Sequence, residues 1–259
     1  MWRSLVSQSK PFFEVILPSC DRPRLVQRAM ASVLGQTWAD WRLWLLDMSS
    51  EENWERIKRW WDENGLGMPH LKDKASARHW RKEDVPRGRV PYSWTTNQVW
   101  NLLRPDAFAS YLTDDAYYPP DRLEAFAAHI AEHPACEAVY GEQIRINRGV
   151  ARFPEGAALC FMPARPVLAA ELAEHNWIDH NALVHKVHLL NAEEKPWVEE
   201  LKWIKVGDWK CWHKVIARTD IDFIKHVVAL DEWHPNGLSE MNAQAIRDRF
   251  EEAAHAVSQ

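Results

Sequence analysis

Two apolar strands, each followed by a helix, open the chain and constrain its fold more than any other feature. The runs at residues 12–17 and 41–46 predict two buried strands. Apolar side chains recur every fourth residue across 23–35, which indicates an amphipathic helix, and a polar helix is expected at 50–64. Strand, helix, strand, helix in this order predicts a right-handed parallel α/β unit.

Polar residues follow each predicted strand at its carboxyl end, including a third strand expected at 109–112. In a parallel sheet these ends share one edge, where open α/β sheets bind ligands. Hard oxygen ligands such as aspartate suit Mg²⁺ or Mn²⁺, so the edge fits a nucleotide and a cation. Taken alone, two adjacent aspartates could also form a solvated turn. The residues concerned are Pro18, Ser19, Cys20, Asp47, Asp114 and Asp115.

Composition narrows the class of protein. A chain of 259 residues with 46% hydrophobic content can bury one large core. Its 32 basic and 37 acidic side chains give 32 − 37 = −5, so we expect no nucleic-acid partner. Four scattered cysteines without a Cys-x-x-Cys pair indicate reduced thiols and no structural zinc site. The sequence lacks a signal-peptide core and a long apolar run, so we expect a cytoplasmic protein without a transmembrane segment.

The middle and the end of the chain carry less regular patterns. Residues 67–91 are basic and poor in apolar periodicity, which predicts a mobile charged loop. Arg87 and Arg89 are the candidates in it to close over a diphosphate, although a solvated surface segment is the alternative. Further elements are expected as helices at 94–103 and 120–133 and as a strand and hairpin across 138–153. An amphipathic helix at 239–257 should either dock on the domain or pair two chains into a homodimer.

Several motifs together resemble one enzyme family. The segments VILPS (15–19), ASVLGQT (31–37) and DWRLWLLD (40–47) are similar to the nucleotide-binding half of inverting family 2 glycosyltransferases of the GT-A fold. YLTDDAYYPPDRL (111–123), IDH (178–180) and IKVGD (204–208) are similar, in that order, to segments of spore coat polysaccharide glycosyltransferases. The resemblance covers roughly residues 12–235.

The resemblance implies one GT-A domain with a mixed, mainly parallel sheet flanked by helices. Its nucleotide-sugar-binding half would span 12–118, its acceptor half 119–235 and a C-terminal helical extension 236–259. The donor would be a UDP- or dTDP-linked sugar, and the acceptor a glycan or another hydroxyl compound. A divalent cation, Mg²⁺ or Mn²⁺, would assist the transfer of the sugar.

The resemblance also implies roles for individual residues. Asp115 matches the metal-binding carboxylate, and Asp47 matches an acidic residue that faces the nucleoside. Asp208 matches the base that takes the acceptor proton, although an aspartate before Trp209 could instead cap a helix. Asp179 matches a carboxylate on the acceptor side, where His180 would help to shape the pocket.

Three positions differ from the family pattern, namely Thr113, Met48 and Cys20. Thr113 replaces the first aspartate of the metal motif, and the other two replace residues that contact the base. They leave open a degenerate protein that binds nucleotide or glycan without turnover. A sugar nucleotidyltransferase is the enzymatic alternative, because it also needs carboxylates and a metal. No Gly-x-Gly-x-x-Gly or phosphate-loop motif occurs, so the sequence supports neither a dinucleotide-binding fold nor a phosphate-loop NTPase.

Overall fold

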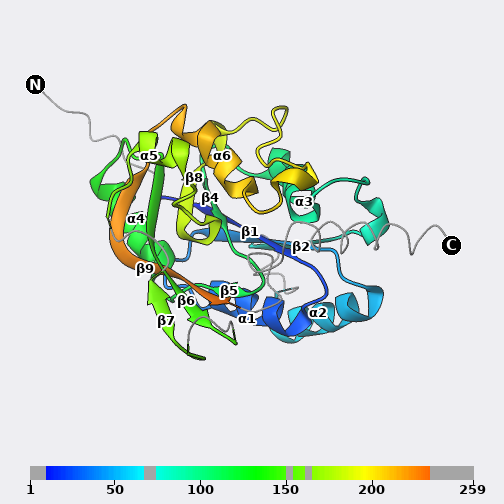
Figure 1. The fold of residues 1–259 in the computed structure, drawn as a ribbon. Helices are drawn as coiled ribbons and strands as arrows, with labels where there is room; N and C mark the ends of the chain where they lie inside the picture. Colours follow the sequence, from blue (N-terminus) through cyan, green and yellow to red (C-terminus); the bar gives the residue numbers. More distant parts are fainter. Residues whose placement is uncertain (1–9, 67–73, 150–153, 161–164, 234–259) are drawn as a thin grey trace, which may run out of the picture.

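The structure, a computed structural model, describes residues 10–66, 74–149, 154–160 and 165–233. The return strand expected near 150–153 and the helix expected at 239–257 lie outside these residues. Strands and helices alternate through the first half of the chain, and the second half adds longer strands (Figure 1). This order agrees with the α/β class expected from the sequence.

All the strands belong to one sheet, with the order β3-β2-β1-β4-β8-β6-β9-β5 and β7 paired to β6. The strands are β1 (Phe13–Ser19), β2 (Trp41–Asp47), β3 (Ala75–His79), β4 (Phe108–Tyr111), β5 (Ala116–Tyr117), β6 (Ala138–Asn147), β7 (Ala158–Cys160), β8 (Leu183–Lys186) and β9 (Asp222–Trp233).

Helices cover both faces of this sheet. The α-helices are α1 (Pro23–Leu34), α2 (Glu51–Glu63), α3 (Pro91–Val99), α4 (Arg122–Glu132), α5 (Ala169–Glu174) and α6 (Gly207–Ile216). Single turns of 3₁₀-helix are η1 (Lys82–Asp84), η2 (Trp100–Leu102), η3 (His180–Ala182), η4 (Val187–Leu189) and η5 (Leu201–Trp203).

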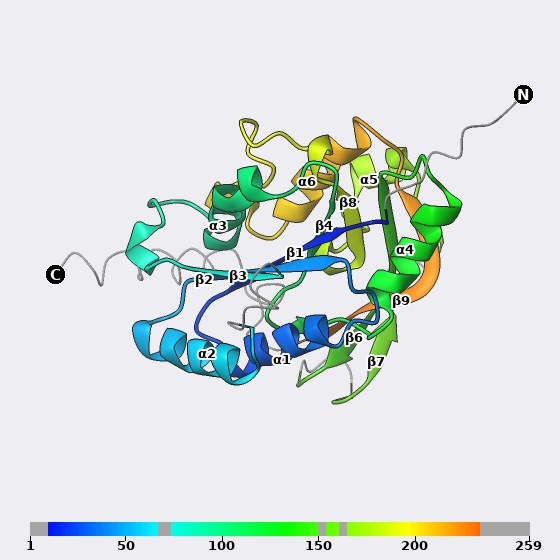
Figure 2. The same ribbon diagram turned by 180° about the vertical axis from the view of Figure 1, so that it is seen from behind.

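The parallel part of the sheet contains β3, β2, β1 and β4. Helices α1 and α2 lie on one side of it, and α3 and α6 lie on the other (Figures 1 and 2). Because both faces are covered, β1 and β2 are continuous apolar runs rather than alternating ones. Phe13 and the residues from Val15 to Leu17 are fully buried in the resulting core.

Strand β3 corrects the expectation of an irregular loop through residues 67–91. Ala75–His79 pairs in parallel with β2 and forms the edge of the sheet. Its sequence, ASARH, lacks the apolar run that marks a central strand, because an edge strand tolerates charged and half-exposed side chains. The rest of the described segment contains η1 and the loop that leads to α3, and residues 67–73 lie outside the description.

The second half of the sheet combines both strand directions. β8 pairs antiparallel with β4 and β6, whereas β6 and β9 run parallel with a register shift near Gly141. A β-carbon on Gly141 would lie 2.5 Å from Val228 Cγ1 and 2.8 Å from the His226 carbonyl oxygen. Only glycine fits there, so this residue permits the irregular pairing by which β9 follows β6 along its length.

Candidate active site

The carboxyl ends of three neighbouring strands meet at one edge, as the sequence predicts. Ser19 pairs with Asp47 across β1 and β2, and the β1–β4 register places Ser19 opposite the turn that contains Asp114. The Ser19 hydroxyl donates a hydrogen bond of 3.4 Å to Asp114 Oδ2. Ser19 therefore lies between the two predicted carboxylates, and Pro18 precedes it within the strand.

Asp114 and Asp115 share one cationic partner that sequence reasoning missed. Arg22, the residue just before α1, places Nη1 3.1 Å from Asp114 Oδ1 and 3.1 Å from Asp115 Oδ2. We call Arg22, Asp114 and Asp115 the arginine cluster. Asp114 is 7% exposed, and burial, reinforced by the charge of Asp115 and opposed by Arg22, raises its pKa to about 7. With all three groups ionised the cluster has a net charge of −1, which leaves an attraction for a second cation.

A second ion pair joins the basic segment to the end of β1. Asp21 has a φ of 54° and accepts hydrogen bonds from the Ser50 backbone N–H (2.7 Å) and from Asn53 Nδ2 (3.1 Å). The Lys82 ammonium also contacts its carboxylate. Burial alone would raise the pKa of Asp21, but the hydrogen bonds, first that of Lys82, lower it to about 2. Lys82 is thus a basic side chain of this segment that reaches the end of β1, and no apolar pattern marks it in the sequence.

Arg87 and Arg89 follow η1 but do not contact the arginine cluster in the described part of the chain. Arg87 is exposed, and Arg89 Nη1 lies 3.7 Å from Glu199 Oε2. Arg89 also forms an isolated bridge with Glu200, which joins this loop to the segment before α6. Their predicted contact with a diphosphate stays a prediction.

Asp47 and Cys20 are turned toward the protein interior. Asp47 is fully buried, and its carboxylate accepts hydrogen bonds from the Ser49 backbone N–H (3.0 Å) and hydroxyl (2.8 Å). Burial raises the pKa of Asp47 despite these donors. The Cys20 thiol donates to the Met48 carbonyl oxygen at 3.5 Å, and burial raises its pKa to about 11, so it stays protonated at neutral pH.

A second cluster unites the residues predicted for the acceptor side and for the base. His180 Nδ1 lies 3.6 Å from Asp208 Oδ2 and 3.9 Å from Asp179 Oδ1. We call Asp179, His180 and Asp208 the histidine cluster. These residues come from η3, the residue before it and the first turn of α6, so the fold brings together two segments far apart in the sequence.

The two carboxylate oxygens of Asp208 differ in their partners. Oδ1 accepts hydrogen bonds from the Trp209 backbone N–H (2.8 Å) and from Asn176 Nδ2 (3.1 Å). The N-cap of α6 is Val206 rather than Asp208, yet Oδ1 does bind a backbone N–H of the first turn. The helix therefore uses one oxygen of Asp208, and the other faces His180.

His180 is cationic at neutral pH. Burial alone would lower its pKa, but the carboxylates of Asp179 and Asp208 raise it to about 9. Burial alone would raise the pKa of Asp179, but the charges of His180 and Arg145 lower it. The imidazolium thus compensates two carboxylates that the fold holds out of water.

Arg145 and β9 connect the two clusters, and sequence reasoning missed both. Arg145 Nε lies 2.6 Å from Asp231 Oδ2, and its Nη2 lies 3.7 Å from Asp179 Oδ2. The next residue of β9, Glu232, donates its backbone N–H to the Asp115 carbonyl oxygen at 3.2 Å. Burial raises the pKa of Asp231 to about 7, and the nearby charge of Asp115 contributes. The two clusters therefore border one continuous polar region.

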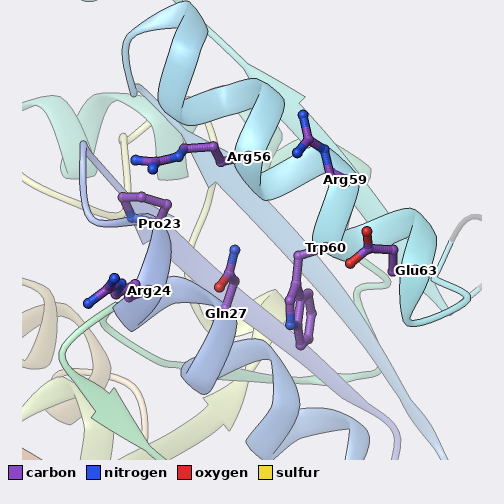
Figure 3. Close-up of a pocket in the computed structure, with 7 residues that line it drawn as sticks. All are labelled: Pro23, Arg24, Gln27, Arg56, Arg59, Trp60 and Glu63. Atoms are coloured by element: carbon purple, nitrogen blue, oxygen red, sulfur yellow. The ribbon is translucent and has the colours of Figure 1, made fainter.

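A separate groove lies between α1 and α2 (Figure 3). It has a volume of about 310 Å³, and three arginines, Arg24, Arg56 and Arg59, line it together with the ring of Trp60. None of the residues predicted to bind a donor lines this groove. It lies between two surface helices and not at the strand ends, so we do not assign the site to it.

The sequence is similar to a curated protein over most of this chain. No family model matches the sequence. The chain is 26% identical over 211 residues to protein CgeD of Bacillus subtilis, an alignment that covers 78% of this chain and 45% of CgeD. The chain thus spans about half the length of that curated relative.

Solved structures resemble the whole described fold. The structure of S. aureus TarS residues 1–349 in complex with UDP-GlcNAc matches with a TM-score of 0.64 and 13% identity, over 93% of this chain and 66% of that TarS segment. The mannosyltransferase PcManGT of Pyrobaculum calidifontis, in complex with GDP-Man and Mn²⁺, matches with a TM-score of 0.59 and 14% identity, over 96% of this chain and 64% of that one. In the described ranges, no helix has the length and apolar character needed to span a bilayer.

Proposed function

We propose that this chain, which has the GT-A fold of glycosyltransferases, is a cation-dependent inverting glycosyltransferase. It would move a sugar from a nucleoside diphosphate to an acceptor hydroxyl. The observation that carries the proposal is the pair of partly buried carboxylate clusters on one polar region, one at the strand ends and one at the start of α6. The UDP-GlcNAc of the TarS complex and the GDP-Man and Mn²⁺ of the mannosyltransferase complex support it.

Residues 12–118 would form the donor half, with the diphosphate at the arginine cluster. The residues present fit Mg²⁺ or Mn²⁺, because the donors are carboxylate oxygens and because the Arg22 guanidinium already stands between them as a cation. Asp115, whose side chain is 24% exposed, would hold the metal, with Asp114 beside it. A bound cation would neutralise charge on the departing nucleoside diphosphate.

Residues 119–235 would form the acceptor half, with Asp208 as the base. The acceptor oxygen would attack the anomeric carbon, form the new glycosidic bond and pass its proton to Asp208 Oδ2 as the bond to the diphosphate breaks. Asp179 and the His180 imidazolium would position this carboxylate and the acceptor. Residues 236–259 would extend the acceptor half. We propose a polysaccharide acceptor, that of a spore coat included, on sequence resemblance.

The test is sugar transfer from a panel of UDP-, dTDP- and GDP-sugars, with Mn²⁺ or Mg²⁺, to oligosaccharide acceptors. Release of the nucleoside diphosphate gives the rate, and NMR of the anomeric proton gives the product configuration. An inverted anomer formed only with a cation is expected. A retained anomer would contradict the mechanism, whereas release of pyrophosphate from a nucleoside triphosphate and a sugar phosphate would identify a nucleotidyltransferase instead.

A protein that binds a nucleoside diphosphate without turning over any donor would match the degenerate alternative. One observation favours that alternative, since Arg22 pairs with both carboxylates that a catalytic metal would need. Turnover in the panel above decides between the two.

A further inference from the structure

A group of potential metal ligands lies at the end of α4, remote from both carboxylate clusters. His129 lies in the last turn of α4, Cys136 in the loop after it, and Asp222 is the first residue of β9. One ligand atom from each of these three residues lies within 4.8 Å of the others. Asp222 precedes Asp231 by nine residues on β9, up to about 30 Å along an extended strand.

Local contacts join two of these side chains and position the third. His129 Nε2 lies 2.9 Å from Asp222 Oδ2, and the Cys136 thiol contacts the Ala138 carbonyl oxygen at 3.5 Å. Cys136 is buried, and the side chain of His129 is 15% exposed. Asp222 pairs with Val139 across β6 and β9, so the sheet fixes one side of the group and α4 fixes the other.

A fourth ligand stands one helical turn from the first. His133 follows His129 by four residues, and the two ring centroids are 4.4 Å apart. The Cys136 backbone N–H donates to the His133 carbonyl oxygen at 2.8 Å, so this loop folds back on the end of the helix. The ring of His133 is exposed. His133 is the C-cap of α4, and two histidines at i and i+4 place their rings on the same side of a helix, which is a metal-binding spacing.

We propose that His129, Cys136 and Asp222 bind Zn²⁺, with His133 as the fourth ligand. A thiolate, two imidazoles and a carboxylate are a donor set that suits tetrahedral zinc, whereas Mg²⁺ and Ca²⁺ prefer oxygen ligands alone. On binding, the Cys136 sulfur forms a bond to zinc and its proton passes to the solvent. The ion joins the end of α4 to the first residue of β9, and it acts at a distance from the sugar-transfer site proposed above.

The test is a calorimetric titration of Zn²⁺ into the full chain after treatment with a chelator. One site per chain is expected. C136S and D222N should each weaken Zn²⁺ binding by at least about 10-fold, since mutation of residues that only orient the ligands typically lowers metal affinity 10–100-fold. H188Q is the matched control. His188 also pairs with a carboxylate, that of Glu137 at 3.0 Å, but it is not one of the proposed zinc ligands. The Zn²⁺ affinity of H188Q should equal that of the wild type.

A Co²⁺ titration distinguishes the loss of a metal ligand from the failure of a variant to fold. The wild-type protein should develop a thiolate-to-cobalt charge-transfer band, which H188Q keeps and C136S lacks while circular dichroism shows the same secondary structure. H133Q should weaken Zn²⁺ binding and keep the charge-transfer band. Absence of the band in the wild type, or Zn²⁺ affinity unchanged in both C136S and D222N, would overturn the proposal.

Discussion

The arginine cluster and the histidine cluster each compensate the charge of two carboxylates, but they use different cations. Each holds two carboxylates largely out of water and places one cationic side chain near both of them, and in the second cluster Arg145 also pairs with Asp179. Arg22 keeps its charge at every accessible pH, whereas His180 loses its proton when the pH rises through about 9. The cation of the first cluster can therefore be exchanged only for another cation, whereas the cation of the second can also lose its charge by titration.

This difference agrees with the roles proposed for the two clusters. A donor site that binds a metal with a diphosphate needs carboxylates that stay together when no ligand is bound, and Arg22 provides that compensation. A base needs a carboxylate oxygen that can take a proton, and Asp208 keeps Oδ2 on the side of His180 rather than on the side of the helix. Each role can be tested by a variant that changes one cluster and leaves the other intact.

The largest effect is expected from Asp208→Asn. The amide cannot take the acceptor proton, so the rate of sugar transfer should fall by about 10²–10⁴-fold, the range for a positioned general base. Its side chain keeps an oxygen to accept from the Trp209 N–H, so the thermal midpoint and nucleotide binding should change little. Asp220→Asn is the control, because Asp220 is exposed beyond α6. Turnover of Asp208→Asn near the wild-type rate would show that another group is the base.

Arg22→Gln should destabilise the protein and increase its response to a cation. Removing one partner of a fully buried ion pair costs about 3–5 kcal/mol, and the partial exposure of Arg22 and Asp115 reduces this to about 1–3 kcal/mol. Mn²⁺ should then raise the melting temperature of the variant more than that of the wild type. Arg24→Gln, an exposed neighbour, is the control. An equal response of Arg22→Gln and the wild type to Mn²⁺ would contradict a shared cation position.

The pH dependence of the free energy of unfolding tests the charge of His180. The pKa of His180 is raised from 6.5 to about 9 in the folded protein, so its contribution is fully present below about pH 6.5 and is lost as the pH rises through about 9. The stability difference between the wild type and His180→Gln should therefore shrink over this window, by up to about 3 kcal/mol. Urea unfolding from pH 6 to 10 measures it. His175→Gln, at an exposed histidine, is the control, and a constant difference for His180→Gln would refute the assignment.

The sequence predicts where backbone segments end better than which side chains meet. Apolar runs identify β1, β2 and β4, and their parallel order places Ser19 beside Asp114 before any contact is known. The resemblance pairs Asp179 with Asp208, and the structure brings both to His180. The first feature follows from strand direction and local patterns, which a single sequence contains, and the second follows from the resemblance.

The unpredicted features depend on long side chains and on weak local patterns. Arg22, Lys82 and Arg145 reach partners across the fold, and nothing in their neighbouring residues specifies the direction in which each extends. Strand β3 lacks an apolar run because it lies at an edge. The helical spacing of His129 and His133 was a readable signal, but the position of Asp222 beside it required the fold.

The most direct test of the central claim is a thermal-shift comparison of the wild type and Asp115→Asn with UDP, dTDP, GDP and CDP, each with and without Mn²⁺. A ligand at about 100 times its Kd adds about 2.7 kcal/mol, which for a chain of this size is a rise of roughly 5–10 °C. The account predicts a rise that requires Mn²⁺, occurs with one or two of the diphosphates and is lost in Asp115→Asn. No rise with any diphosphate, or an equal rise in Asp115→Asn, would contradict a cation-dependent donor site at the arginine cluster.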